Sequence, residues 1–295
     1  MRFRENALGL LVPCEPRCYF DVSPRAGGLV HGVNLGAGGG SLPAWLSQFG
    51  GGGGGPTPSS PVAEYLKSGY RESDATTPED SEEVVDWINS GTNGSDLTQA
   101  GASPAPPIHH TDVGGLGTSG LLADGTLWMY NTSFNTTSWG AMTWYCGVDT
   151  ASPPPNTLTL MQQETSGGVL IARLYVNTSG QICFQYRVAP TTYSAITTAT
   201  PYTGPQGSFS SIIVTRDASD GQIAIWFNNV KQTLGTDTKG TGTTSGSGQR
   251  VSIFSDATGS ASNAWIGFMT ECGMYDRKLT DAQVGSLHTA LALGF

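Results

Sequence analysis

The stretch Ser210–Gln232 reads SSIIVTRDASDGQIAIWFNNVKQ, and it decides the fold. Ile212 to Thr215 is a run of β-branched residues, and Gln222 to Phe227 adds the aliphatic and aromatic side chains typical of strands. Between them, Asp217 to Gly221 has turn chemistry, because Asp and Ser bond the nearby backbone and Gly accepts a positive φ. Asn228-Asn229 offers a second turn. Because a hairpin is not stable alone in water, the stretch predicts further strands and a covered face, and hence an antiparallel β-sandwich.

The composition agrees with turn-rich β-structure. The chain has 295 residues, enough for one large β-domain of about 200 residues and an appendage. Only 13% of the residues are charged and 41 are glycine, which favours strands and turns over helices. The formal net charge of -9 repels phosphate backbones, so nucleic acid is not expected as a partner.

Short hydrophobic segments separated by turn signals recur along the chain. They lie at residues 84–88, 121–130, 139–148, 158–163, 169–176, 182–188, 193–196, 251–254 and 264–275. This regular spacing predicts a two-sheet sandwich or jelly roll. One helix is predicted at the end, because Thr280 and Gln283 fit a capping box, and Val284, Leu287 and Leu291 share a face.

We predict two parts that meet at residue 84. Residues 1–83 form an N-terminal arm and extended glycine-rich segment, with a strand candidate at 18–23, and residues 84–295 form the sandwich. Within the first part, Pro61 to Gly69 is expected to form one or two helical turns that end at the glycine.

Glycine-rich stretches are the main source of predicted mobility, because glycine loses the most entropy on ordering. They lie at 36–40 and 50–55, and the Thr/Gly/Ser loop 235–248 is expected to behave in the same way. The apolar segment Leu42 to Phe49 lies between the first two. It either packs on its own domain or anchors a neighbouring chain, and the sequence leaves both interpretations open.

The chain start carries no membrane signal that we recognise. Met1 to Glu5 leads into an apolar run, Ala7 to Val12, which is too short for a membrane span and lacks a small-residue cleavage site. We therefore expect synthesis in a cytoplasm and no membrane partner.

The five cysteines have irregular spacing that does not resemble a disulfide framework. Cys183 and Cys272 lie in apolar strand segments and are expected to be buried. Cys14 and Cys18 would form half of a zinc site, but no second pair follows at zinc spacing. No metal or other cofactor is therefore expected.

Candidate catalytic groups are sparse. The main strand carboxylates, Glu164 and Glu271, lie in unrelated segments, whereas glycosidases need two close carboxylates. His109-His110 beside Asp112 could ligate a metal, but we favour exposed loop histidines there. We expect no enzyme activity.

Five motifs occur in an order that resembles a known family. They are the Trp87 strand with its Gly/Asn loop (85–99), the prolines at 104–107, Asp124-Gly125 before a strand, Thr215-Arg216-Asp217, and 266–280 with the following helix. This order resembles concanavalin A-like sandwiches of the laminin-G type found in tailed-phage virion structural proteins, over roughly residues 84–292. The resemblance implies an all-β, two-sheet antiparallel jelly roll with one short C-terminal helix, joined here to an extended glycine-rich N-terminal arm. It does not specify function, because the fold hosts lectins, hydrolases and structural modules.

The resemblance implies a virion structural protein, and we expect a capsid decoration or cement protein that attaches to the shell through its arm. Its partners would be the major capsid protein or other virion proteins. The chain itself would form a homo-oligomer, such as a trimer. Its location would be the virion. The expected assembly contacts are Tyr19, Phe20, Trp45, Leu46 and Phe49.

The alternative is a carbohydrate-binding adhesion module of a phage tail or fibre that recognises host glycan. Lectins stack sugars on exposed aromatic rings, although strand aromatics more often belong to the core. The candidate contacts are Tyr130, Trp139, Tyr193 and Tyr202.

The decoration hypothesis predicts that the arm is required for attachment. Deleting residues 1–60 should abolish co-purification of the protein with virus particles, because the anchoring aromatic residues are removed. Particle sedimentation followed by gel analysis measures this. Unchanged attachment of the truncated protein would exclude the arm as the anchor.

Overall fold

The computed structural model describes residues 3–5, 11–13, 66–75, 80–81, 83–84, 86–92, 96–99, 107–111, 120–125, 128–131, 133–134, 136, 139–149, 156–198, 209–244, 249–255 and 263–293. The chain divides into two compact units, Met1–Gly55 and Pro56–Phe295. In the first unit, β1 (Phe3–Glu5) and β2 (Leu11–Pro13) pair as an antiparallel hairpin. The predicted strand at 18–23 lies outside the described residues.

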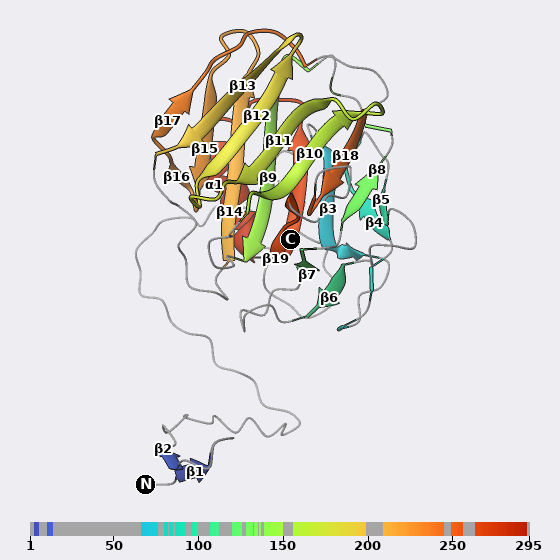
Figure 1. Ribbon diagram of the computed structural model, residues 1–295, viewed down its shortest axis with the longest axis vertical. Coiled ribbons are helices and arrows are strands. Elements are labelled where there is room, and N and C mark those ends of the chain that lie inside the picture. The colour runs from blue at the N-terminus through green and yellow to red at the C-terminus, as the bar shows by residue number, and fades with distance from the viewer. Residues whose placement is uncertain are drawn as a thin grey trace, which may run out of the picture. The chain divides into compact units, whose positions relative to one another are not determined.

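The second unit is a two-layer antiparallel β-sandwich, as predicted (Figure 1). In order across the first layer, the strands are β17 (Leu234–Asp237), β13 (Thr191–Thr197), β12 (Ile182–Val188), β11 (Leu170–Val176), β10 (Leu158–Thr165), β18 (Gln249–Ile253), β8 (Met129–Asn131), β5 (Leu97–Gln99) and β4 (Asp86–Asn89).

The second layer packs against the first. Its strands are β16 (Val230–Lys231), β15 (Ile223–Phe227), β14 (Phe209–Asp217), β9 (Ala141–Asp149) and β19 (Ile266–Tyr275), and β19 is followed by β3 (Leu66–Ala75), β7 (Gly120–Asp124) and β6 (Ile108–His110). Because β4 pairs with both β5 and β3, the two layers are joined along one edge.

Strand β3 differs from the sequence expectation. Leu66 to Ala75 pairs with β19, so the predicted helical turns over 61–69 are wrong at their C-terminal end. The neighbouring strand, rather than local propensity, determines this conformation. The sandwich therefore already includes β3, whereas the sequence predicts that it starts at residue 84.

The hairpin predicted at Ser210–Gln232 is confirmed as β14 and β15. At its turn, the Asp217 carboxylate accepts hydrogen bonds from the Ser219 amide (2.9 Å) and hydroxyl (2.7 Å). Gly221 has a φ of +69°, which glycine adopts without strain. Asn228 and Asn229 also have positive φ values, as a two-residue turn between β15 and β16 requires.

The main core lies between the layers and is rich in aromatic residues. Trp87, Trp144 and Trp265 are fully buried. Trp144 of β9 contacts Phe184 of β12 edge to face, with ring centroids 5.5 Å apart, so this contact joins the two layers. Truncating an aromatic residue in such a core costs about 3–5 kcal/mol of stability.

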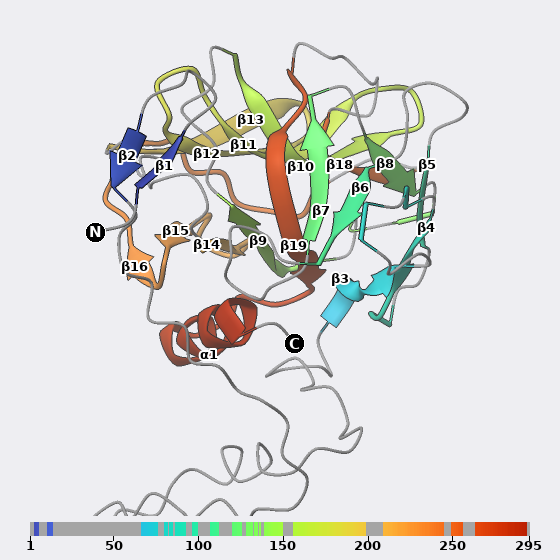
Figure 2. The ribbon, with the colours of Figure 1, turned by 90° about the horizontal axis from the view of Figure 1, so that it is seen from below.

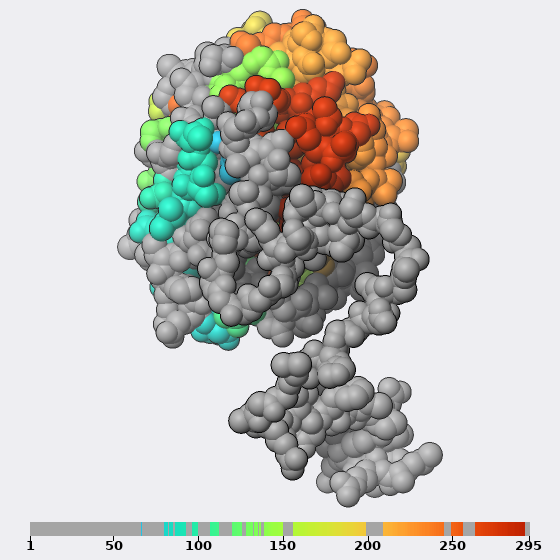
Figure 3. Space-filling model, turned by 180° about the vertical axis from the view of Figure 1, so that it is seen from behind, coloured from blue at the N-terminus to red at the C-terminus, as the bar shows by residue number. Residues whose placement is uncertain are grey.

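Helix α1 (Asp281–Leu293) covers the outer face of the second layer (Figure 2). Val284, Leu287 and Leu291 pack on Tyr145 of β9 and Ile213 of β14, and together they form a second hydrophobic cluster. From behind, the red surface of the C-terminal region lies beside the orange surface of β14–β16 (Figure 3). In the described part of the chain, no helix is long and apolar enough to cross a membrane.

Polar contacts hold α1 at its N-terminal end and at its middle. The predicted capping box is confirmed: the Thr280 amide donates to the Gln283 side chain (2.9 Å), and the Gln283 amide donates to the Thr280 hydroxyl (3.3 Å). In the middle of the helix, His288 Nδ1 lies 2.7 Å from the Ser211 hydroxyl on β14. Burial lowers the pKa of His288 from its ordinary value of 6.5.

We predict that His288 makes stability depend on pH. Because its pKa is lower in the folded state, the unfolded chain takes up the proton first as the pH falls. Its stabilising contribution is therefore complete above about pH 6.5 and is lost as the pH falls towards the folded pKa. Thermal melting of wild type and His288→Gln between pH 8 and 5 measures this. The difference between them should shrink or reverse at low pH, and parallel curves would contradict the prediction.

The loop expected to be mobile at 235–248 is instead fixed over its described part, residues 235–244. The buried Arg216 guanidinium donates to the carbonyls of Gly240 (3.1 Å) and Gly242 (2.6 Å) and lies 4.1 Å from the centroid of the Tyr186 ring. The Tyr186 hydroxyl also bonds Gly240. Glycine content indicated mobility, but these long-range contacts outweigh the entropy of the segment.

We predict that only glycine fits at position 240, where Arg216 and Tyr186 hold the loop, because a β-carbon there would lie 2.2 Å from the Tyr193 ring. We expect Gly240→Ala to cost about 1–3 kcal/mol through overpacking. Gly140→Ala is the matched control, since a β-carbon there meets nothing within 4 Å. Chemical denaturation measures both variants, and equal stabilities would contradict the steric explanation.

Candidate polar face of the first layer

The strands of the first layer bury one face in the main core and carry both polar and apolar residues on the other. On β11, for example, Ala172 and Leu174 belong to the core, whereas Arg173 points to the opposite face, because side chains alternate along a strand. We call this opposite surface the outer face of the first layer. Its central residues are Gln162, Glu164, Ile171, Arg173, Tyr175, Cys183, Gln185, Arg187, Ser194, Arg250 and Ser252.

A row of polar residues crosses this face at one strand register. The row comprises, in spatial order, Tyr130, Ser252, Gln162, Arg173, Gln185 and Ser194, and each pairs with the next across neighbouring strands. Directly opposed side chains lie about 4.5–5.5 Å apart at their β-carbons, so neighbouring members of the row adjoin one another. Within this row Ser252 and Gln162 are buried, whereas Tyr130, Arg173, Gln185 and Ser194 are partly exposed.

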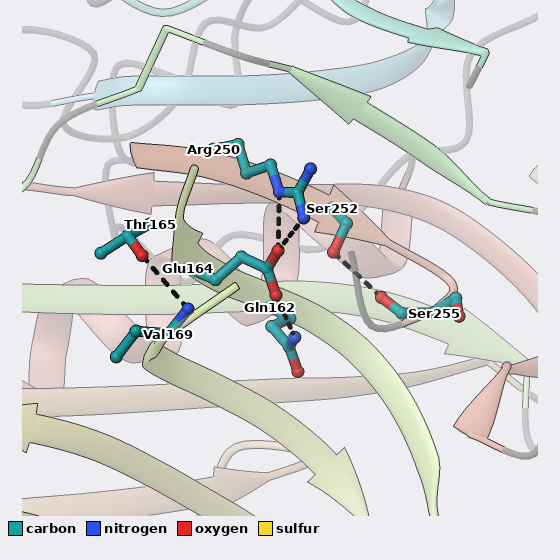
Figure 4. Close-up of polar contacts among 7 residues, drawn as sticks. All are labelled: Gln162, Glu164, Thr165, Val169, Arg250, Ser252 and Ser255. Carbon is teal, nitrogen blue, oxygen red and sulfur yellow. Dashed lines mark hydrogen bonds and ion pairs between the residues drawn. The ribbon is translucent and has the colours of Figure 1, made fainter. Parts of the chain in front are cut away.

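A charged pair lies beside the row (Figure 4). One Glu164 oxygen accepts hydrogen bonds from Nε and Nη2 of Arg250, and the other accepts from Gln162 Nε2 at 3.0 Å. The Glu164 side chain is 2% exposed and that of Arg250 is 25% exposed. Because both carboxylate oxygens are engaged, Glu164 is held as an ion-pair partner and its charge is matched.

Arg173 occupies the middle of the row. It donates from Nη2 to Gln185 Oε1 at 3.1 Å, and its guanidinium lies 4.2 Å from the centroid of the Tyr175 ring. Burial raises the pKa of Tyr175 to about 12, and burial likewise raises the pKa of Cys183 to about 11. Both groups are therefore neutral at pH 7, and neither offsets the charge of Arg173.

An aromatic pair lies at one end of the row. Tyr130 lies on β8, and Trp128 directly precedes this strand. Their ring centroids are 5.3 Å apart, and their ring planes are inclined by 32°. Both side chains are partly exposed. Tyr130 pairs with Ser252, so the two rings adjoin the polar row directly.

The predicted glycan contacts are distributed over different parts of the fold. Tyr130 lies on the outer face. Trp139 is only 7% exposed and contacts Phe134 edge to face at 5.5 Å, inside the core. Tyr193 stacks on Tyr186 on the inner side of the first layer. Tyr202 lies outside the described residues.

The predicted assembly contacts, Tyr19, Phe20, Trp45, Leu46 and Phe49, all lie outside the described residues, as do Cys14 and Cys18. The expected buried cysteines are confirmed, since Cys183 and Cys272 are free and buried.

Other candidate groups lie away from this face. His109 is buried on β6, so the expectation of two exposed loop histidines is wrong for this residue. His110 Nδ1 lies 3.5 Å from Asp80, and among the described residues no cluster of metal-ligating groups occurs. Glu271 lies on β19 in the second layer and accepts a hydrogen bond from Tyr145 (2.9 Å), whereas Glu164 lies on the first layer.

Sequence reasoning missed most of the outer face, including Trp128, Arg173, Gln185 and Arg250. A usable signal was present in the sequence. In Leu170–Val176 and Ile182–Val188, polar residues alternate with core residues, which places Arg173 and Gln185 on the same side of adjacent strands.

Comparison with known proteins supports the fold. No protein-family model matches the chain, and no curated protein matches it. Among solved structures, the botulinum neurotoxin serotype D binding domain has a TM-score of 0.50 and 7% identity, covering 77% of this chain and 52% of that chain.

Two further structures have lower scores. A Trypanosoma rangeli sialidase in complex with 2,3-difluoro-KDN has a TM-score of 0.48 and 16% identity. The match covers 82% of this chain and 34% of the sialidase chain. A Ruminococcus gnavus sialidase carbohydrate-binding module bound to sialyllactose has a TM-score of 0.42 and 14% identity. The match covers 54% of this chain and 85% of the module. The present chain thus spans about a third of the trypanosomal sialidase and half of the toxin domain.

The toxin likeness shows the fold alone, a β-sandwich, in agreement with the two-sheet sandwich that the sequence predicts. The predicted link to tailed-phage virion proteins stays a prediction.

Proposed function

We propose that this chain is a carbohydrate-binding module and that the outer face of the first layer binds the saccharide. The observation that carries the proposal is the polar row from Tyr130 to Ser194, with Trp128 at its aromatic end. Sugar rings present apolar faces that pack on aromatic rings, and their hydroxyl groups need several hydrogen-bonding partners. Trp128 and Tyr130 supply the aromatic rings, and the partly exposed Arg173, Gln185 and Ser194 supply the hydrogen-bonding groups.

The arrangement also suits binding because its side chains are already positioned. Gln185 is held by Arg173 and also lies 3.5 Å from the Ser194 hydroxyl, at the limit of a hydrogen bond. Ser252 is buried and donates to the Ser255 carbonyl at 3.0 Å, so it fixes the strand beneath the row (Figure 4). Groups fixed before binding lose little conformational entropy when a ligand arrives, which favours affinity.

The resemblance to virion proteins extends the proposal to a location and a ligand source. The module would be part of a phage tail or fibre, and its ligand would be a glycan of the host surface. The carboxylates Glu164 and Glu271 lie on different layers, which favours a binding role over glycosidic cleavage.

The proposal predicts that the aromatic pair is needed for binding. On a glycan array the wild-type protein should bind a defined set of oligosaccharides. Trp128→Ala and Tyr130→Ala should each weaken that binding about tenfold, which corresponds to a loss of about 1.4 kcal/mol of stacking. Isothermal calorimetry with the best array ligand measures the loss.

Val230→Ala is the control, because this exposed residue lies on β16 in the second layer. It should bind as wild type does. Absence of any saccharide binding, or full binding by both aromatic variants, would overturn the proposed function.

A further inference from the structure

Resting on the proposed function, we infer that the saccharide bound by the outer face carries a negative charge, as a carboxylate or sulfate group, and that Arg173 binds this group. The inference starts from a contrast between two arginines on the same face. Arg250 has its counter-charge in Glu164. Arg173 has no carboxylate partner among the described residues, and its contacts are the neutral Gln185 and the Tyr175 ring.

The donors of Arg173 are incompletely used. Its Nε is buried and makes no hydrogen bond within the described part of the chain. Buried polar groups in folded proteins are nearly always paired, so the described chain satisfies the guanidinium of Arg173 less completely than that of Arg250. A planar guanidinium matches a carboxylate or sulfate oxygen pair in geometry as well as charge.

The surrounding charges favour an anion. On the central strands β10, β11, β12, β13 and β18, the outward charged residues are Glu164, Arg173, Arg187 and Arg250. Arg187 lies diagonally from Arg173 on the adjacent strand, about 7–8 Å away by standard sheet geometry. It too has no ion pair among the described residues.

This local excess of positive charge contrasts with the rest of the molecule. The whole chain has a net charge of -9, so an acidic ligand would be repelled from most of the surface. It would be attracted where two arginines have no counter-charge. The adjacent Trp128 and Tyr130 provide the aromatic surface for the sugar ring that carries the acid.

The test compares each acidic saccharide with its neutral counterpart. Suitable pairs are oligogalacturonate with its methyl ester, a sialylated oligosaccharide with its desialylated form, and a sulfated galactan with its desulfated form. At least one acidic member should bind about tenfold or more tightly than its neutral form, and raising the salt concentration should weaken that preference. Equal binding of the members of every pair would overturn the inference.

Variants identify the arginine responsible. Arg173→Met retains the apolar stem and removes the charge, so it should reduce affinity for the acidic ligand about tenfold more than affinity for its neutral counterpart. Arg173→Lys should retain part of the preference because it keeps the charge and loses the planar fork. Melting curves check that the variants fold. If Arg173→Met does not fold, the lysine variant and the salt dependence of the wild type decide.

The outcomes separate the two proposals. Binding of neutral and acidic saccharides with equal affinity, lost in Trp128→Ala, would refute the charge preference and leave the carbohydrate-binding function standing. An acidic preference that Arg173→Met and Arg173→Lys both retain would refute the role of Arg173. Binding of no saccharide of either kind would refute both.

Discussion

The packing of α1 on the second layer makes the two outer faces of the sandwich different. Leu287 and Leu291 of the helix cover Tyr145 and Ile213, so β9 and β14 are buried on both sides. The helix does not cover the strands of the first layer, although Gln162, Glu164 and Ser252 on their outer face are buried. The aromatic pair and the partly exposed arginines, Arg173, Arg187 and Arg250, therefore lie on the face that the helix does not cover.

The interior beneath this face keeps it in place. Trp144 and Phe184 join the layers, and Arg216 ties the glycine loop at Gly240 to Tyr186, whose neighbours on β12 include Gln185. A buried arginine that bonds only carbonyls and a ring has a high desolvation cost, which its tight geometry must offset. Strand β12 thus contributes Tyr186 to the contacts that hold the glycine loop and, on its opposite face, Gln185 to the proposed site.

Local patterns predicted most strands and the helix, whereas features that depend on distant residues were not predictable. The turn at Asp217–Gly221 and the capping box at Thr280 are local, so their chemistry is visible in the sequence. Strand β3 was missed because Leu66–Ala75 is mostly polar and becomes a strand by pairing with β19. On the candidate face, Tyr130 was found because aromatic residues at strand ends suggested sugars. Arg173 was missed because its lack of a counter-charge is evident only once its neighbours are known.

The most direct test of this account is a crystal structure of the protein with a bound acidic oligosaccharide. The account predicts the sugar ring against Trp128 and Tyr130, with an acidic oxygen about 3 Å from a nitrogen of Arg173. A saccharide seated on the helix side of the second layer, or one whose charged group avoids Arg173, would contradict it.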